Sequence, residues 1–227
     1  MQRGLFAADF LLAKSMMSDT RLGDIYQVRI RREDFIRRDD WQTVKRLGGG
    51  AAYYAMTDLV LQALRLLSLP PIQMWSELKR VASLGDAEDC AHVCLKTRGM
   101  ISADLEFNGG VLSESRGPSF EIRGTRGVFT VRRNASEGVL TVIDPDFSFP
   151  RRRSSVRTPP LGDLHEDVPV KTFSVSLPKG TPHGPSDFWK HVYDTVRTAA
   201  PFPLALEESI ESIKFVHLMK KTSPFGK

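Results

Sequence analysis

The sequence predicts an α+β fold: an open, mostly antiparallel β-sheet with helices packed on one face. Three observations support this prediction. The chain begins with helix-like segments, continues with six or more consecutive strand-like segments, and closes with two helices. Runs of strands beside runs of helices are typical of the α+β class. The length of 227 residues suits one domain, and we expect residues 1–227 to form it.

The first third of the chain alternates helices with one strand. Residues 7–18 have the spacing of a short amphipathic helix, which the turn at Gly23 follows. Residues 25–30 are rich in β-prone side chains and predict a strand. Residues 51–67 are almost wholly apolar, which predicts a buried helix that ends before Pro70-Pro71.

A series of strands occupies the middle of the chain. Residues 144–169 hold five prolines and an arginine run, so we expect an excursion loop there. Residues 170–176 suit one more strand. Ser186 is the expected N-cap of a helix over 187–198, and residues 206–220 predict the last helix. Glycine-rich or charged turns separate the predicted strands 72–82, 91–97, 101–107, 120–123, 128–131 and 139–143.

Composition excludes several classes of protein. Apolar residues make up 41% of the chain and charged residues 26%, so a packed core is expected and wholesale disorder is not. The longest apolar run is broken by Asp58 and Arg65, which argues against a membrane span, and Asp9 argues against a signal peptide. We therefore expect a cytoplasmic protein. The net charge is +5, but acidic residues follow the first arginine cluster, so nucleic-acid binding is not expected.

The two cysteines belong to a predicted strand. Cys90, His92 and Cys94 alternate with apolar residues and share one face at steps of roughly 6.6–7 Å. This spacing is too wide for one zinc ion to bind all three side chains. We expect half-buried thiols in a reducing compartment and no metal site.

The predicted helix over residues 51–67, which follows Gly48–Gly50, carries a polar stripe. Tyr54, Asp58, Gln62 and Arg65 are spaced by four, four and three positions, so they lie on one side of an apolar helix. Two interpretations remain open. The stripe forms an internal network in which Asp58 pairs with Arg65 or a neighbouring strand, or it lines a small-molecule pocket with Asp58 as its polar centre.

The segment before this helix supplies two further candidates. Trp41 is a large aromatic in a polar segment, suited to stack on a sugar ring or to anchor the loop, and core anchoring is favoured. Lys45 is a candidate substrate contact in the same segment. Gly48–Gly50 match no nucleotide fingerprint, so tight packing of the helix start is expected. Any pocket should lie where the Tyr54–Asp58 stripe meets the Trp41 loop.

Several segments together resemble the C-terminal, dihydrodipicolinate-reductase-like domain of the Gfo/Idh/MocA oxidoreductases. They are residues 40–50 with the helix that follows, residues 70–77, residues 85–89, the hairpin 122–127 and the closing helices. The resemblance implies a substrate-binding and oligomerisation domain of an NAD(P)-dependent oxidoreductase that acts on sugar- or inositol-like substrates. In that family an N-terminal Rossmann domain binds the cofactor and carries a lysine in a Glu-Lys-Pro motif.

Two departures limit what this resemblance implies. The 227 residues contain neither a dinucleotide fingerprint nor Glu-Lys-Pro, so we expect no cofactor site and no catalysis by this chain alone. The family's catalytic Asp and His fall at Tyr54 and Asp58, so no catalytic residue is assigned. The alternative is a cofactor-free scaffold that assembles through its open sheet.

A homodimer is expected in either case. An open sheet with helices on one side leaves its other face free, and an exposed apolar face usually marks an interface. We expect this face to be apolar through Val93, Leu95, Leu105 and Phe107 or through their neighbours on the opposite side of the strands.

Overall fold

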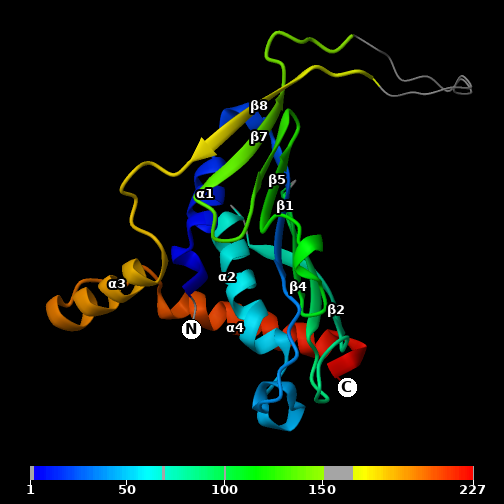
Figure 1. The fold of residues 1–227 in the computed structure, drawn as a ribbon, viewed down its shortest axis with the longest axis vertical. Coiled ribbons are helices and arrows are strands. Elements are labelled where there is room, and N and C mark those ends of the chain that lie inside the picture. Colours follow the sequence, from blue (N-terminus) through cyan, green and yellow to red (C-terminus); the bar gives the residue numbers. More distant parts are fainter. Residues whose placement is uncertain (1–2, 68–69, 100, 151–165, 227) are drawn as a thin grey trace, which may run out of the picture.

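The computed structural model describes residues 3–67, 70–99, 101–150 and 166–226. One open sheet holds eight strands in the order β2-β3-β4-β1-β5-β6-β7-β8 (Figure 1). β1 runs parallel to β4, and all other neighbouring strands are antiparallel. The predicted α+β class and open sheet are confirmed. The strands are β1 (Ile25–Glu33), β2 (Pro71–Lys79), β3 (Cys90–Thr97), β4 (Ser102–Asn108), β5 (Phe120–Gly124), β6 (Gly127–Val131), β7 (Glu137–Ile143) and β8 (Val170–Ser176).

Helices cover one face of this sheet. α1 (Ala8–Met16) packs against β5, β6 and β7, and α2 (Thr57–Leu66) packs against β1 and β4. α4 (Leu206–Thr222) lies against α2 and β2. α3 (Gly184–Thr198) extends away from the sheet and contacts the 3₁₀ turn at Arg3–Phe6 (Figure 1). The N-terminal segment is therefore enclosed by α2 and α3, which are distant in sequence.

Strand alternation places the core between the sheet and the helices. Side chains at every second position of the central strands are almost fully buried, as the period of two requires. Val93, Leu95, Leu105 and Phe107 all belong to this buried set and are at most 3% exposed. They therefore pack beneath the helices and do not face solvent.

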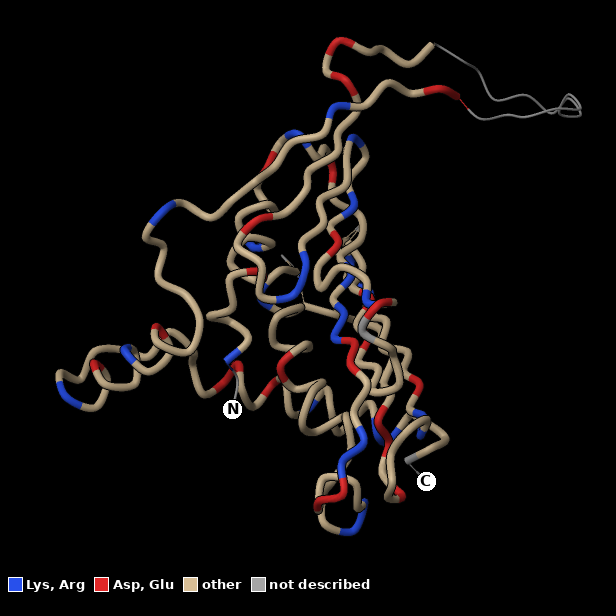
Figure 2. The backbone as a smooth tube through the Cα atoms, in the orientation of Figure 1, with Lys and Arg blue, Asp and Glu red and all other residues tan. Residues whose placement is uncertain are grey.

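The other face of the central strands is charged, so the prediction of an apolar face is wrong. Arg29 and Arg31 of β1 alternate with the buried Val28 and Ile30. Positions of both signs interleave along the sheet (Figure 2). The neighbours of the core residues along each strand point away from the core, so polar side chains are tolerated there. The free face also carries His92, Cys94, Asp104, Glu106, Glu121 and Arg123.

Some element boundaries differ from the predicted ones. β1 continues to Glu33, three residues beyond the predicted end, because its last residues pair with the parallel strand β4. α3 begins at Gly184 with His183 as its N-cap, so Ser186 lies inside the helix and is not the cap. Pro185 occupies one of the first helical positions, where its missing N–H costs no hydrogen bond.

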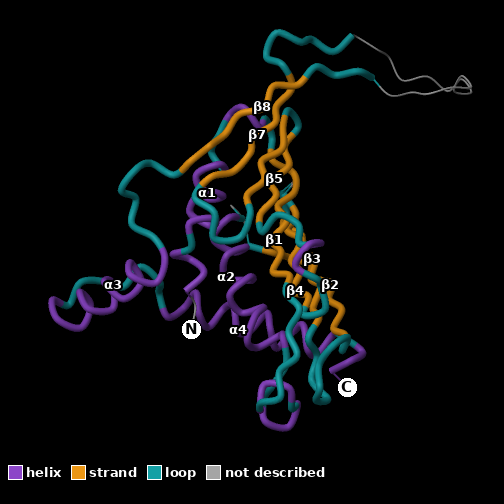
Figure 3. The backbone as a smooth tube through the Cα atoms, in the orientation of Figure 1, coloured by secondary structure: helices purple, strands orange, loops and turns teal. Residues whose placement is uncertain are grey.

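Residues 144–150 after β7 and residues 166–169 before β8 lie beyond the end of the sheet (Figure 3). Of the predicted excursion loop 144–169, residues 144–150 and 166–169 lie outside helices and strands, and residues 151–165 are outside the described part. Asp144 begins a turn that Lys171 closes with an ion pair of 2.9 Å. None of the helices in the described part of the chain is long and apolar enough to cross a membrane.

Candidate functional site

The helix that carries the candidate residues starts at the glycines. Gly50 has a φ of +117°, and a Cβ there would lie 2.2 Å from the buried Glu88 Oε1. The Glu88 carboxylate accepts hydrogen bonds from the Ala52 N–H at 3.4 Å and from Lys220 Nζ at 3.3 Å. A π-helical turn over Ala52–Met56 then leads into α2. The glycines thus allow the helix start to pack on a buried ion pair, as expected.

Asp58 lies in the first turn of α2 and faces the N-terminal segment. Its Oδ1 accepts a hydrogen bond from the Gly4 backbone N–H at 3.3 Å. Together with Arg32 of β1 it lines a pocket of ≈ 570 Å³. The pocket brings together segments distant in sequence, because β1, α2, the loop after β6 and the start of α3 all reach it. Its other polar or cationic lining residues are Arg3, Arg133, Asn134 and His183.

Burial and opposite charge control the electrostatics of this pocket. Burial raises the pKa of the Asp58 carboxyl, while the charge of Arg32 and the hydrogen bond from Gly4 oppose this effect. Burial lowers the pKa of Arg32, and the nearby Arg133 adds to the lowering, while Asp58 and Asp9 oppose it. The two opposite charges, both half-buried, therefore stabilise each other.

Arg32 retains free donor capacity in the pocket. Its Nε is buried and has no hydrogen-bond partner among the described residues. A guanidinium presents five N–H donors in a fixed fork, which suits hydroxyl or anionic oxygens. The arrangement can therefore bind a small polyhydroxylated molecule between one carboxylate acceptor and one guanidinium donor.

Tyr54 lies in a different and much smaller cleft. Its ring meets Phe107 edge-on with the centroids 5.4 Å apart, and it shares the cleft with Arg38 and Gln42. Burial, with Asp89 nearby, raises the pKa of Tyr54 to about 12. The phenol therefore stays protonated near neutral pH and can donate a hydrogen bond. Tyr54 and Asp58 occupy consecutive helical turns, but they line separate clefts.

Trp41 and Lys45 belong to two 3₁₀ turns before the glycines. Trp41 is 56% exposed, so the expectation that it anchors its loop in the core is wrong. Its turn is held by the Asp40 side chain, which accepts a hydrogen bond from the Gln42 N–H at 3.0 Å. Lys45 Nζ lies 4.0 Å from the centroid of the Phe225 ring and donates to the Phe225 carbonyl at 3.1 Å. Neither residue lines the Asp58 pocket.

The remaining stripe residues serve the packing of the helices. Arg65 forms an ion pair of 2.5 Å with Glu208 of α4 and donates to the Pro203 carbonyl at 2.9 Å. It therefore does not pair with Asp58. Gln62 is fully buried, and neither of its amide atoms has a hydrogen-bond partner among the described residues. The stripe thus divides into Asp58, which lines a pocket, and Arg65, which joins α2 to α4.

Arg32 is the pocket residue that sequence reasoning missed. Because acidic residues follow its arginine cluster, no binding role is predicted for it from the sequence. Its position in the strand identifies it. Arg32 lies two residues after Ile30 and four after Val28, so it occupies the same side of β1 as these buried residues. An arginine at an inward position of a strand needs a partner or a ligand. Asp58 lines the same pocket and provides the opposite charge.

Known proteins share both the sequence pattern and this fold. Residues 10–130 match the C-terminal domain of the GFO/IDH/MocA family. This chain belongs to that family. Over 134 residues it is 29% identical to an uncharacterised oxidoreductase of Schizosaccharomyces pombe, a match that covers 56% of this chain and 36% of that protein.

Solved structures of an NAD-binding protein and of an oxidoreductase have the same fold. An NAD-binding protein from Listeria innocua superposes with a TM-score of 0.73 at 18% identity, over 98% of this chain and 63% of that one. An oxidoreductase from Bacillus cereus gives a TM-score of 0.68 at 16% identity, over 96% of this chain and 63% of that one. The GFO/IDH/MocA chain described here thus spans less than two thirds of the length of these relatives.

Proposed function

We propose that this chain is the substrate-binding and oligomerisation domain of an NAD(P)-dependent oxidoreductase acting on sugar- or inositol-like substrates. The observation that carries the proposal is the pocket in which Asp58, at the start of the helix after the glycines, lies with the half-buried Arg32. This chain by itself performs no hydride transfer. A cofactor domain would hold the nicotinamide, which would supply the hydride-transfer chemistry.

The residues of the pocket suit a polyol. The Asp58 carboxylate accepts hydrogen bonds from substrate hydroxyls, and Arg32 and Asn134 donate to substrate oxygens. Because burial raises the pKa of Asp58, the carboxyl is also a better proton acceptor than an exposed aspartate. Binding between one acceptor and two donors orients a ring that carries several hydroxyl groups.

The cofactor domain, joined to this sequence or separate, is proposed to cover the outer side of α3. Trp189, Tyr193 and Val196 are 51%, 61% and 77% exposed there. Exposed apolar side chains gathered on one element usually mark a contact surface. Gly184 and Pro185, at the start of the same helix, line the Asp58 pocket. A domain that covered α3 would therefore also close the pocket.

Calorimetric titration with myo-inositol tests the substrate proposal. We expect measurable binding by the wild-type chain and a loss of at least about tenfold in affinity for Asp58→Ala, which corresponds to one lost charge-assisted hydrogen bond. Asp146→Asn is the control, because its side chain is 94% exposed and does not line the pocket. Unchanged affinity in a folded Asp58→Ala chain would refute the assignment of the pocket.

Titration with NADH and NADPH tests the cofactor proposal. The 227 residues contain no Gly-x-Gly-x-x-Gly turn to admit a pyrophosphate to a helix N-terminus. We therefore expect no appreciable binding of either dinucleotide. A dissociation constant in the low micromolar range would overturn this expectation and reveal a cofactor site within the chain.

The oligomerisation role is proposed for the free sheet face. Its charged side chains are of both signs, so a second copy can pair with them through polar contacts. Light scattering should give the mass of two 25.4 kDa chains at low ionic strength and a lower mass in concentrated salt. Glu121→Lys on the face should weaken the dimer, and Glu211→Lys on α4 should not. A mass of 25.4 kDa under all conditions would exclude the dimer.

A further inference from the structure

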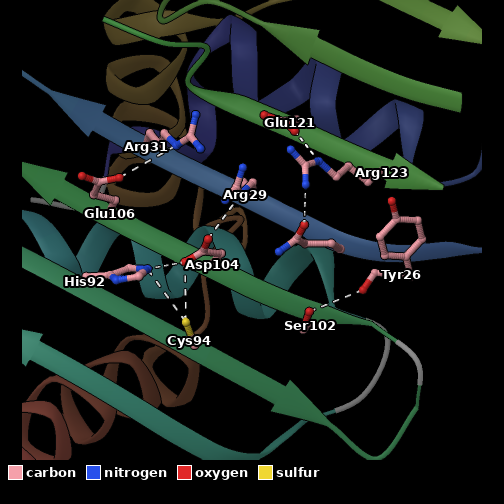
Figure 4. Close-up of polar contacts among 11 residues, drawn as sticks. Tyr26, Arg29, Arg31, His92, Cys94, Ser102, Asp104, Glu106, Glu121 and Arg123 are labelled. Carbon is pink, nitrogen blue, oxygen red and sulfur yellow. Dashed lines mark hydrogen bonds and ion pairs between the residues drawn. The ribbon is translucent and has the colours of Figure 1, made fainter. Parts of the chain in front are cut away.

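Three side chains with metal-binding atoms converge on the free face of the sheet. His92 and Cys94 come from β3, and Asp104 comes from the neighbouring strand β4 (Figure 4). The three ligand atoms lie within 4.8 Å of one another. The antiparallel register places Asp104 directly opposite Cys94, which brings its carboxylate toward both β3 side chains. The cluster lies on the opposite side of the sheet from the Asp58 pocket, since Val93 and Leu105 point to the helices.

The separations of the three atoms suit a tetrahedral ion. Cys94 Sγ lies 3.8 Å from His92 Nε2 and 3.6 Å from Asp104 Oδ1. Zinc bonds of about 2.3 Å to sulfur and about 2.0–2.1 Å to nitrogen or oxygen place such ligand pairs roughly 3.5–3.6 Å apart at tetrahedral angles. Two of the three distances between ligand atoms therefore need almost no adjustment. The third distance, from His92 Nε2 to Asp104 Oδ1, is 2.5 Å and would increase by less than about 1 Å.

The second carboxylate oxygen is already held in place. Arg29 Nε of β1 donates a hydrogen bond to Asp104 Oδ2 at 3.2 Å, which leaves Oδ1 directed at His92 and Cys94. Outer partners of this kind orient a metal-binding carboxylate. The Trp75 ring meets the His92 ring edge-on with the centroids 5.3 Å apart and restricts its rotation. The Asp104 and His92 side chains are thus oriented before any ion arrives.

Space for a further ligand lies beside the sulfur. A shallow depression of ≈ 730 Å³ is lined by Trp75, Cys94 and Ser102, among others. It gives an ion access to the cluster and leaves room for a water molecule at a fourth position. The Cys94 side chain borders this depression and is exposed.

We propose that His92, Cys94 and Asp104 form a binding site for a Zn²⁺-like divalent transition metal with one open coordination position. The mixed set of imidazole, thiolate and carboxylate favours zinc or cobalt over calcium or magnesium, which bind oxygen ligands. Binding releases the thiol proton of Cys94 to solvent, and the imidazole binds in its neutral form. The charges of the ion and Arg29 are then largely offset by the thiolate and the Asp104 carboxylate.

Cys90 gives this proposal a matched control. It lies on the same face of β3, two positions before His92, and burial raises the pKa of its thiol to about 11. Its strand partner is Asn108, so no carboxylate lies opposite it. If either cysteine of β3 could bind the ion, replacing Cys90 or replacing Cys94 would weaken metal binding. In the proposed site only the replacement of Cys94 weakens it.

Cobalt substitution tests the proposal spectroscopically. Titration of the whole chain with Co²⁺ should produce a thiolate-to-cobalt charge-transfer band and intense visible bands of four-coordinate geometry, saturating at one ion per chain. Zn²⁺ should displace the cobalt. Cys94→Ser should abolish the charge-transfer band, Asp104→Asn should weaken binding at least about tenfold, and Cys90→Ser should preserve both. Circular dichroism confirms that each variant is folded.

Three results would overturn the proposal. The first is the absence of a charge-transfer band at a cobalt concentration of about 1 mM, which corresponds to an affinity too weak for a built site. The second is a band that survives in Cys94→Ser and disappears in Cys90→Ser. The third is saturation at half an ion per chain, because the ligands would then come from two copies and not from one.

Discussion

The backbone N–H of Gly4 donates a hydrogen bond to Asp58 Oδ1 across 54 positions of sequence. The approach is so close that a Cβ on Gly4 would lie 2.4 Å from Asp58 Oδ2 and 2.5 Å from Gln62 Nε2. This contact joins the N-terminal segment to α2 and forms one wall of the pocket. The same atoms therefore contribute both to the stability of the fold and to the geometry of the pocket.

Gly4→Ala should therefore destabilise the fold. The added methyl group overlaps the half-buried Asp58 and the buried Gln62, and overpacking of this kind costs about 1–3 kcal/mol. Urea unfolding measures the loss. Lys14→Ala, on an exposed position of α1, is the control and should change the stability by less than about 0.5 kcal/mol. Equal effects of the two substitutions would mean that the N-terminal segment does not dock on α2 as described.

Gln62→Leu should stabilise the protein. Both amide atoms of Gln62 are buried without a hydrogen-bond partner in the described part of the chain, and such groups carry an uncompensated loss of hydration. An apolar side chain of similar size removes that cost, so we expect a gain of about 1–2 kcal/mol in thermal or urea unfolding. The exposed Gln73→Leu provides the comparison and should give no such gain. A destabilised Gln62→Leu chain would contradict the absence of partners.

Asp58 should make the stability depend on pH. Burial raises the pKa of its carboxyl, so in the window from pH about 4 up to the raised pKa the folded chain holds a proton that the unfolded chain has lost. The free energy of unfolding contributed by this group therefore falls as the pH rises through that window and is level above it. Relative to wild type, Asp58→Asn should become more stable across the same window.

Urea unfolding at a series of pH values measures this difference. Asp146→Asn, whose side chain is 94% exposed, should run parallel to wild type at every pH. If the stability of Asp58→Asn relative to wild type decreased as the pH rose, the carboxyl would have a lowered pKa, and Arg32 would dominate over burial.

The ion pair between Arg65 and Glu208 should couple α2 to α4. The two side chains are 26% and 37% exposed, and Glu208 also accepts a hydrogen bond from the Ala205 N–H at the start of α4. A double-mutant cycle of Arg65→Ala and Glu208→Ala should give a coupling energy of about 0.5–1 kcal/mol. Strictly additive effects would show that the pair contributes nothing. Lys214 and Glu211, a more exposed pair within α4, should give a smaller coupling.

The sequence by itself determined the elements of this fold and its class. Strand alternation predicts which residues of β3 and β4 enter the core, and helical spacing predicts α2 and α4, because both patterns depend only on neighbours along the chain. The charged free face was readable in the same way, since Arg29 and Arg31 alternate with Val28 and Ile30. The expected apolar face is wrong because the positions that alternate with the core residues of β1 hold arginines.

Tertiary structure alone decided which distant residues meet. β1 inserts between β4 and β5, and this pairing aligns Cys94, Asp104 and Arg29 across three strands. Likewise, Asp58 of α2 faces Arg32 only because α2 packs across β1. Strand order and register arise from the burial of the whole core and from closure of the loops between strands, so no local pattern contains them. For this reason the sequence identified Asp58 as a candidate but not Arg32 in the same pocket, and it predicted no metal site at His92 and Cys94 because Asp104 comes from another strand.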